Sequence, residues 1–116
     1  MAARHLARNG YKVLYRNFRA PRGGEVDLVC RERRSATLVF VEVKTRSSEE
    51  HGTPGQAVTL AKQRLITRGA LEWLRLLDHP DIRCRFDVVE VLLTHPDQPE
   101  IRIIPNAFEI PAPYIY

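Results

Sequence analysis

Little in this sequence of 116 residues supports a disulfide-stapled or membrane-spanning protein. It has two cysteines, Cys30 and Cys84, too few for a disulfide scaffold at this length. Both lie in apolar runs, so we expect two buried free thiols, which suits a reducing cytoplasm. No run approaches the ~20 apolar residues that span a bilayer, and no apolar run follows the N-terminal charges as in a signal peptide. We therefore expect a cytoplasmic protein with no membrane partner.

Acidic residues are absent from the first 24 positions, although the chain carries a net charge of only +4. That segment holds six bases: Arg4, Arg8, Lys12, Arg16, Arg19 and Arg22. A cationic arm of this kind favours a polyanionic partner, with nucleic acid as the first candidate. A solvated helix face with a solubilising surface accounts for the same charges equally well.

Lysine is also scarce, with three lysines among 18 basic residues. Where arginine is used almost everywhere, a lysine retained inside a strand draws attention to its compact, titratable ammonium group. Lys44 is such a residue, because it lies in the apolar run "LVFVEVK".

The order of patterns predicts one α/β domain over residues 1–116, with a central mixed sheet of about five strands flanked by helices. Helical spacing marks "AARHLARNG" and a long amphipathic segment from about 59 to 77. Strand patterns cover "YKVLYRNF", "EVDLVC", "TLVFVEVKT", "RCRFDVVEVLLT" and "IRII". The second and third strands, joined by the polar segment "RERRSA", form an antiparallel hairpin.

The strand at residues 38–44 is apolar on both faces, which marks an interior strand covered on both sides. Glu42 and Lys44 continue the row of Leu38 and Phe40, so they extend a buried row. A lone carboxylate in such a place is costly, and it needs a partner or a cation.

The neighbouring strand offers that partner in Asp27. If the hairpin closes symmetrically around Arg34 and Ser35, Asp27 lies opposite Glu42, with Cβ atoms about 5 Å apart. Two carboxylates at this distance repel each other unless a hard divalent cation, Mg²⁺ or Mn²⁺, lies between them. Lys44, about 7 Å further along the strand, would then stand beside a metal-bound water.

This arrangement suits metal-assisted hydrolysis of a phosphodiester. The metal would polarise a phosphoryl oxygen and acidify a water, and Lys44 would orient that water or stabilise the developing negative charge. The alternative is structural: Asp27, Glu42 and Lys44 would form a cross-strand salt-bridge cluster without catalytic use.

The segments around these three residues resemble a known family. "GGEVDLV" followed by "TLVFVEVKTR" resembles the Asp…Glu-x-Lys core of the restriction-endonuclease-like, or PD-(D/E)XK, nucleases. The wider set "AARHLARNGYKVLYRNFRAPRGGEVDLV", "LVFVEVKTRSS", "GTPGQAV", "KQR", "RFDVV" and "NAF" resembles the YraN family of uncharacterised bacterial proteins over nearly the whole chain.

The resemblance implies a restriction-endonuclease-like fold related to Holliday-junction resolvases, with Asp27 and Glu42 as metal ligands and Lys44 as the catalytic lysine. It also implies a further glutamate in a Gly-x-x-Gly-Glu-like segment ahead of "AARHL", which lies before the first residue given.

Four further residues are candidates for substrate binding. Glu25 either joins the site or caps the entrance of its strand. Arg46 lies two residues after Lys44, where bases would hold the substrate backbone. The resemblance implies that Gln56 faces the metal. The alternative is a local role, in which Gln56 pairs with Thr53 to cap the start of a helix. Lys62 contacts phosphates or lies on a solvated helix face.

Three functions remain open on this basis. The first is a Mg²⁺-dependent endonuclease acting on DNA, with branched and single-stranded DNA as candidate substrates. The second is a nucleic-acid-binding module without turnover, and the third is a protein-interaction adaptor that keeps the fold. A homodimer is compatible with the apolar tail "IPAPYIY".

Overall fold

The structure, a computed structural model, describes residues 1–46, 58–78, 80–93 and 97–110. Its elements are α1 (Ala2–Arg8), β1 (Tyr11–Arg19), β2 (Glu25–Glu32), β3 (Leu38–Arg46), α2 (Leu60–Leu76), β4 (Cys84–Leu92) and β5 (Glu100–Phe108). This order confirms the predicted succession of a helix, three strands, a helix and two strands. The fifth strand is longer than "IRII", because an edge strand tolerates Pro105.

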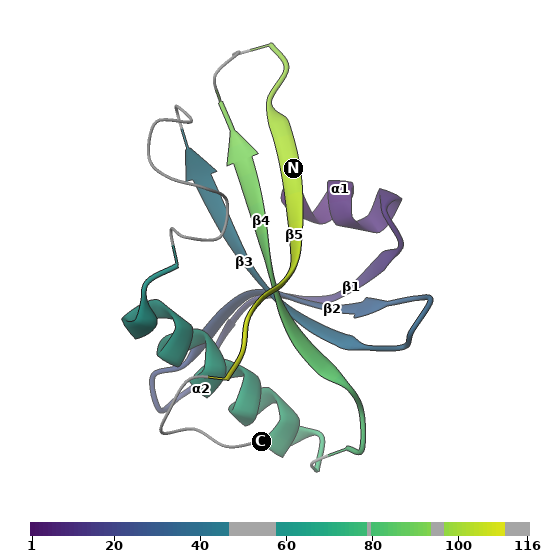
Figure 1. Cartoon of the computed structure of the whole chain (residues 1–116). Coiled ribbons are helices and arrows are strands. Elements are labelled where there is room, and N and C mark those ends of the chain that lie inside the picture. Colours follow the sequence, from purple (N-terminus) through teal and green to yellow (C-terminus); the bar gives the residue numbers. More distant parts are fainter. Residues whose placement is uncertain (47–57, 79, 94–96, 111–116) are drawn as a thin grey trace.

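The strands form one five-stranded sheet in the order β1-β2-β3-β4-β5 (Figure 1). β3 and β4 are parallel, and every other neighbouring pair is antiparallel. A parallel pair requires a crossover connection, and α2 provides it between β3 and β4. The predicted mixed α/β sheet flanked by helices is confirmed.

Each helix covers its own face of the sheet, so there are two apolar cores. On the α2 face, Phe40 of β3 packs with Ile66, Ala70 and Leu74 of the helix. On the opposite face Val39 and Val41 pack with Ala3 and Leu6 of α1. β3 is therefore buried on both sides, as its sequence predicts.

Contact between two glycines fixes α2 against the start of β2. A Cβ atom added to Gly24 would lie 2.2 Å from the backbone nitrogen of Gly69, so both positions need glycine. The helix begins after Thr59, whose side chain accepts a hydrogen bond from the Lys62 backbone at 3.1 Å. The capping pair predicted at Thr53 and Gln56 lies outside the described residues.

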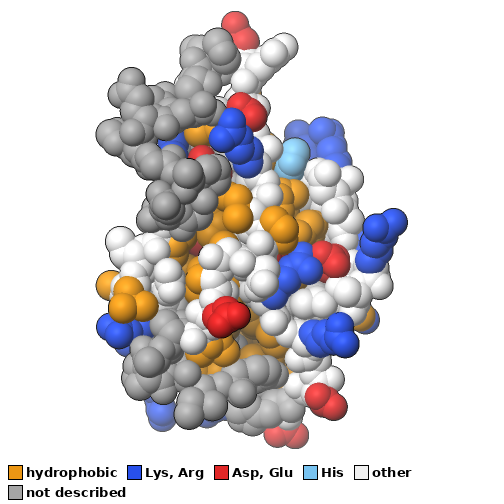
Figure 2. All heavy atoms as spheres, viewed as in Figure 1, with side chains coloured by type: hydrophobic (Ala, Val, Ile, Leu, Met, Phe, Trp, Pro, Cys, Tyr) orange, Lys and Arg blue, Asp and Glu red, His pale blue; other side chains and the backbone are white. Residues whose placement is uncertain are grey.

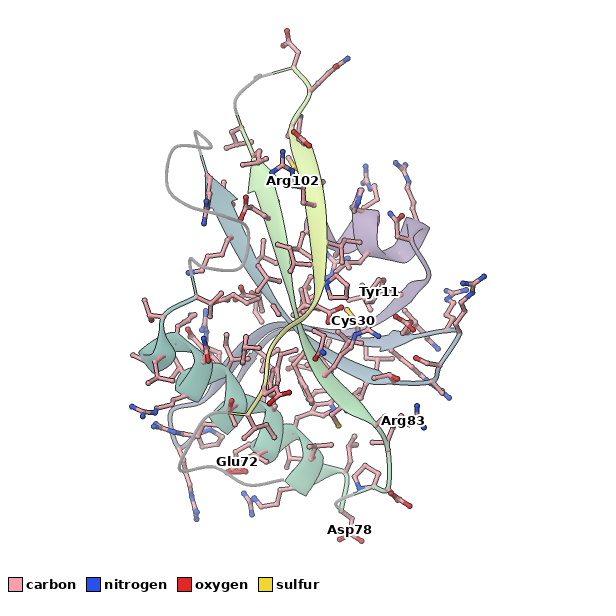
Figure 3. The ribbon with its side chains drawn as sticks, in the orientation of Figure 1. Tyr11, Cys30, Glu72, Asp78, Arg83 and Arg102 are labelled. Carbon is pink, nitrogen blue, oxygen red and sulfur yellow. The ribbon has the colours of Figure 1, made fainter. Side chains whose placement is uncertain are left out.

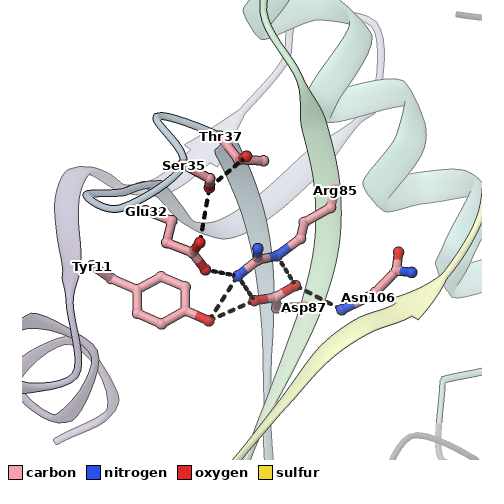
Figure 4. Close-up of polar contacts among 7 residues, drawn as sticks. All are labelled: Tyr11, Glu32, Ser35, Thr37, Arg85, Asp87 and Asn106. Carbon is pink, nitrogen blue, oxygen red and sulfur yellow. Dashed lines mark hydrogen bonds and ion pairs between the residues drawn. The ribbon is translucent and has the colours of Figure 1, made fainter.

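On the α1 face a largely buried polar cluster joins β1, β2, β4 and β5, because Arg85 of β4 also pairs with Glu32 of β2 (Figure 4). Asp87 of β4 accepts hydrogen bonds from the Tyr11 hydroxyl at 2.9 Å and from the Arg85 Nε atom at 2.9 Å. It also accepts one from the Asn106 backbone at 2.9 Å, at an irregular point in the β4–β5 pairing. Burial and the adjacent Asp87 carboxylate raise the pKa of Tyr11 to about 12. We interpret this cluster as structural.

Two further expectations concern the thiols and the membrane. Cys30 is fully buried and Cys84 is half-buried, and both are free, so the prediction of two buried thiols holds fully for Cys30 only. Cys30 lies near Tyr11 in the middle of the molecule (Figure 3). Within the described ranges, neither helix has the length and apolar character needed to cross a bilayer.

Candidate functional site: two acids where β2 and β3 separate

Asp27 and Glu42 meet where the β2–β3 ladder ends. The paired residues nearest to them are Leu28 with Val41, and the same register continued by one step places Asp27 opposite Glu42. This is the predicted symmetric hairpin. Beyond the last pair, the Val43 backbone nitrogen donates a hydrogen bond to Asp27 Oδ2 at 2.8 Å. The Asp27 side chain is therefore held across the strands, beside Glu42.

Glu42 is a buried carboxyl group with an incomplete set of partners. It is 3% exposed, and its Oε2 atom has no hydrogen-bond partner in the structure. The nearest cations are Lys62 Nζ at 3.5 Å and Lys44 Nζ at 4.0 Å. Burial and then the neighbouring Asp27 carboxyl, through a hydrogen bond and its charge, raise the pKa of Glu42 to about 8. Two carboxyl groups thus converge in a poorly solvated place, as the sequence predicts.

Glu25 and Lys62 extend the site toward α2. The Lys62 ammonium donates a hydrogen bond to Glu25 Oε1, and Arg19 of β1 forms an ion pair with the other Glu25 oxygen. Of the two roles open for Glu25, its place in this charged cluster favours the first. Lys62 contacts Glu25 and Glu42 directly, rather than lying on a solvated helix face. Burial lowers the pKa of Lys62, but the hydrogen bond to Glu25 and the charges of Glu42 and Glu25 outweigh this effect and raise it.

Beyond Lys44, a second buried ion pair lies on the same face of the sheet. Arg46 Nε is 3.5 Å from Glu90 Oε2, and both side chains are largely buried. Glu90 belongs to β4 and is the direct ladder neighbour of Lys44. Sequence reasoning gave Glu90 no role, although an acid inside the apolar run "FDVVEVLL" was a signal that could have found it. The carboxylate of Glu90, beside Lys44, is therefore a buried partner of Arg46.

The donor set fits a hard cation. Asp27 and Glu42 offer carboxylate oxygens, one of them without a hydrogen-bond partner, and Mg²⁺ binds through one or two carboxylates while keeping several waters. In the part of the chain that the structure describes, no three His, Cys, Asp or Glu side chains are grouped closely enough to hold a metal by themselves. Water or substrate oxygens would have to complete the coordination. Gln56, the other predicted neighbour of the metal, lies outside the described residues.

Fold and site together define a mixed α/β protein in which two acids and two lysines gather on the α2 face of a five-stranded sheet. The model of the uncharacterised protein family UPF0102 matches residues 1–91, and the chain belongs to this family. It is the YraN family that the motifs resemble. The matched range includes Glu25, Asp27, Glu42, Lys44 and Lys62.

Relatives from several bacteria are similar over almost the whole chain. A UPF0102 protein of Geobacter sulfurreducens is 49% identical over 110 residues, which are 95% of this chain and 84% of the relative. One from Rhodococcus opacus is 47% identical over 93% of this chain and 89% of its own length. One from Symbiobacterium thermophilum is 47% identical over 92% of this chain and 88% of its own length.

Proposed function

We propose that this protein is a Mg²⁺- or Mn²⁺-dependent endonuclease that hydrolyses phosphodiester bonds in DNA in the cytoplasm, with branched and single-stranded DNA as the candidate substrates. The observation that carries the proposal is the convergence of Asp27 and Glu42 on one buried face, with one Glu42 oxygen lacking a hydrogen-bond donor. Buried carboxylate oxygens are normally satisfied by such donors, so this oxygen offers a position that a divalent cation could occupy.

Asp27 and Glu42 would hold the ion, and the surrounding protein restricts the movement of both side chains. Asp27 cannot rotate freely because the Val43 backbone holds Oδ2, and Glu42 is confined by burial. When bound, the ion would polarise a phosphoryl oxygen and lower the pKa of a water. Glu42 must give up its proton to serve as a ligand, which its raised pKa opposes until the cation is present.

Lys44 would supply the positive charge for the reacting phosphate. It follows Glu42 by two residues, so it shares the face of the acids, and its Nζ atom lies 4.0 Å from Glu42 Oε2. Its side chain is 31% exposed, which leaves the ammonium accessible to a substrate. A fixed ammonium at this place would stabilise the negative charge that develops on the phosphoryl oxygens.

The bases around Glu25 would hold the nucleic-acid backbone. Arg19 and Lys62 both contact Glu25, at the edge of the acid pair. Phosphate contacts of this kind position a substrate without reading its sequence, which agrees with a nuclease that recognises DNA structure.

One observation favours a second candidate, a nucleic-acid-binding module without turnover. Lys62 pairs with both Glu25 and Glu42, so lysine already balances part of the acidic charge. In that case the cluster would stabilise the sheet, and the basic surface alone would bind nucleic acid.

The test is a cleavage assay with branched, nicked, linear duplex and single-stranded DNA, in Mg²⁺, Mn²⁺ or EDTA. The proposal expects metal-dependent cleavage of at least one substrate by the wild type and its loss in Asp27→Asn and Lys44→Ala. Arg83→Ala is the matched control, because it removes an exposed base that lies before β4, outside the N-terminal basic segment and the acid site. Wild-type activity no higher than that of Lys44→Ala on every substrate would contradict the proposal.

A further inference from the structure

Lys62 contacts carboxylates that come from two different strands. Its ammonium donates a hydrogen bond to Glu25 Oε1 of β2 and lies 3.5 Å from Glu42 Oε2 of β3. Lys44 approaches the same Glu42 oxygen only to 4.0 Å. Among the described cations, Lys62 is thus the nearest to the oxygen that a bound metal would use.

The position of Lys62 is determined by backbone packing. The Thr59 hydroxyl oxygen accepts a hydrogen bond from the Lys62 backbone nitrogen. This cap fixes the first turn of α2. Two turns later Gly69 lies against the backbone at Glu25, where an added Cβ would come within 2.8 Å of the Glu25 nitrogen. The helix therefore cannot slide along β2, and the Lys62 side chain starts from a fixed point above the acids.

The Lys62 side chain can nevertheless leave the acids. It is 27% exposed and carries the charge on a flexible four-carbon stem, so it can move toward solvent without opening the core. Glu25 would not be left unpaired, because Arg19 binds its second oxygen. Glu42 would lose its nearest cation, and a divalent ion could take that place.

We propose that Lys62 is the resident cation of the acid site, holding Glu25 and Glu42 in place while no divalent ion is bound and giving way when one binds. This inference rests on the proposed function, because the ion is the one proposed there. A divalent ion at Glu42 Oε2 would repel the Lys62 ammonium more strongly than the Lys44 ammonium, because Lys62 Nζ lies nearer to this oxygen, at 3.5 Å against 4.0 Å. Lys62 is therefore a positioning residue for the carboxylates and a competitor of the metal.

The experiment measures the dissociation constant of Mn²⁺ on the full chain, by electron paramagnetic resonance of free Mn²⁺, without DNA. Lys62→Met keeps the apolar stem and removes the charge, Lys62→Arg keeps the charge, and Lys12→Met is the matched control. We expect Lys62→Met to bind Mn²⁺ roughly tenfold more tightly than the wild type. A factor of this size corresponds to removing one partly screened repulsion between the ammonium and the metal ion. Lys62→Arg and Lys12→Met should stay within about twofold of the wild type, because neither removes a charge beside Glu42.

Several outcomes would overturn the inference. If Mn²⁺ binds to the wild type and is lost in Asp27→Asn, but folded Lys62→Met binds it no more tightly than Lys12→Met, the role of Lys62 is wrong and the metal site stands. If neither the wild type nor Lys62→Met binds Mn²⁺, the metal-dependent function fails as well. Thermal melting checks that each variant folds, and Lys62→Gln provides the same comparison should the methionine variant unfold.

Discussion

The ammonium nitrogen of Lys62 lies 3.5 Å from Oε2 of Glu42, although the first belongs to the helix α2 and the second to the central strand β3. The contact joins the crossover helix to the acid pair, and it makes the stability of the site depend on how the helix is held.

Replacing Glu42 by Gln should change how stability depends on pH. The pKa of Glu42 is about 8 in the folded protein and about 4.5 ordinarily, so between these values the folded state holds a proton that the unfolded state has lost. The unfolding free energy should therefore fall as pH rises from about 4.5 to 8 and then level off. Glu42→Gln should remove this decrease and be the more stable protein at pH 9, by a few kcal/mol at about 1.4 kcal/mol per pKa unit.

The pH prediction is checked by urea unfolding in EDTA at a series of pH values. Glu100→Gln, an exposed glutamate at the start of β5, is the control and should follow the wild-type profile. Parallel profiles for Glu42→Gln and the wild type would show that the Glu42 carboxyl group is not perturbed.

Gly24→Ala should destabilise the protein by about 3 kcal/mol, because overpacking at a backbone contact cannot be relieved by a side-chain rotation. The new Cβ would lie 2.2 Å from the Gly69 nitrogen and would push α2 away from β2. Gly10→Ala is the comparison, since Gly10 has φ of +89° with no atom within 4 Å of an added Cβ, so it introduces strain without crowding. Its cost should be about 1 kcal/mol. Equal losses in chemical denaturation would argue against crowding between the helix and β2.

Glu90→Gln should cost about 3 kcal/mol, because it removes the carboxylate charge that lies 3.5 Å from the largely buried Arg46 guanidinium. The double variant Arg46→Met/Glu90→Leu should recover much of that loss, since an apolar pair needs no desolvation of charge. A double-mutant cycle on unfolding free energies measures the coupling. Additive losses would mean that the two side chains do not stabilise each other.

Tyr11→Phe should lower stability by about 1 kcal/mol, because it removes a hydroxyl that donates to Asp87 and accepts from Arg85 (Figure 4). Mn²⁺ affinity should not change, because this cluster lies on the α1 face and the acid pair on the α2 face. Tyr15→Phe is the control, since that residue is half exposed on β1. A weaker Mn²⁺ affinity in Tyr11→Phe would show that the two faces are coupled.

Outside the acid pair, the surface viewed in Figure 2 has lysine and arginine side chains scattered among apolar and neutral atoms. No single broad basic surface is visible from this side. In the proposed function, the bases beside the acids, such as Arg19 and Lys62, hold the backbone of the substrate.

The sequence determined the parts of the site that depend on local periodicity. Alternation along residues 38–44 put Glu42 and Lys44 on one face, and a symmetric reversal around Arg34 and Ser35 was enough to place Asp27 opposite Glu42. Both inferences hold because a strand has a side-chain period of two, so a register shifted by one would have turned the apolar row to the wrong side.

Only the tertiary structure decided which distant residues join that site. Lys62 reaches it because two glycines fix α2 against β2, and Glu90 reaches it because the parallel register aligns β4 with Lys44. Neither contact follows from spacing along the chain. The crossover helix could lie at several heights along the sheet and still bury the same apolar face. The height is set by close packing between elements, which depends on the shapes of surfaces that form only when the chain has folded.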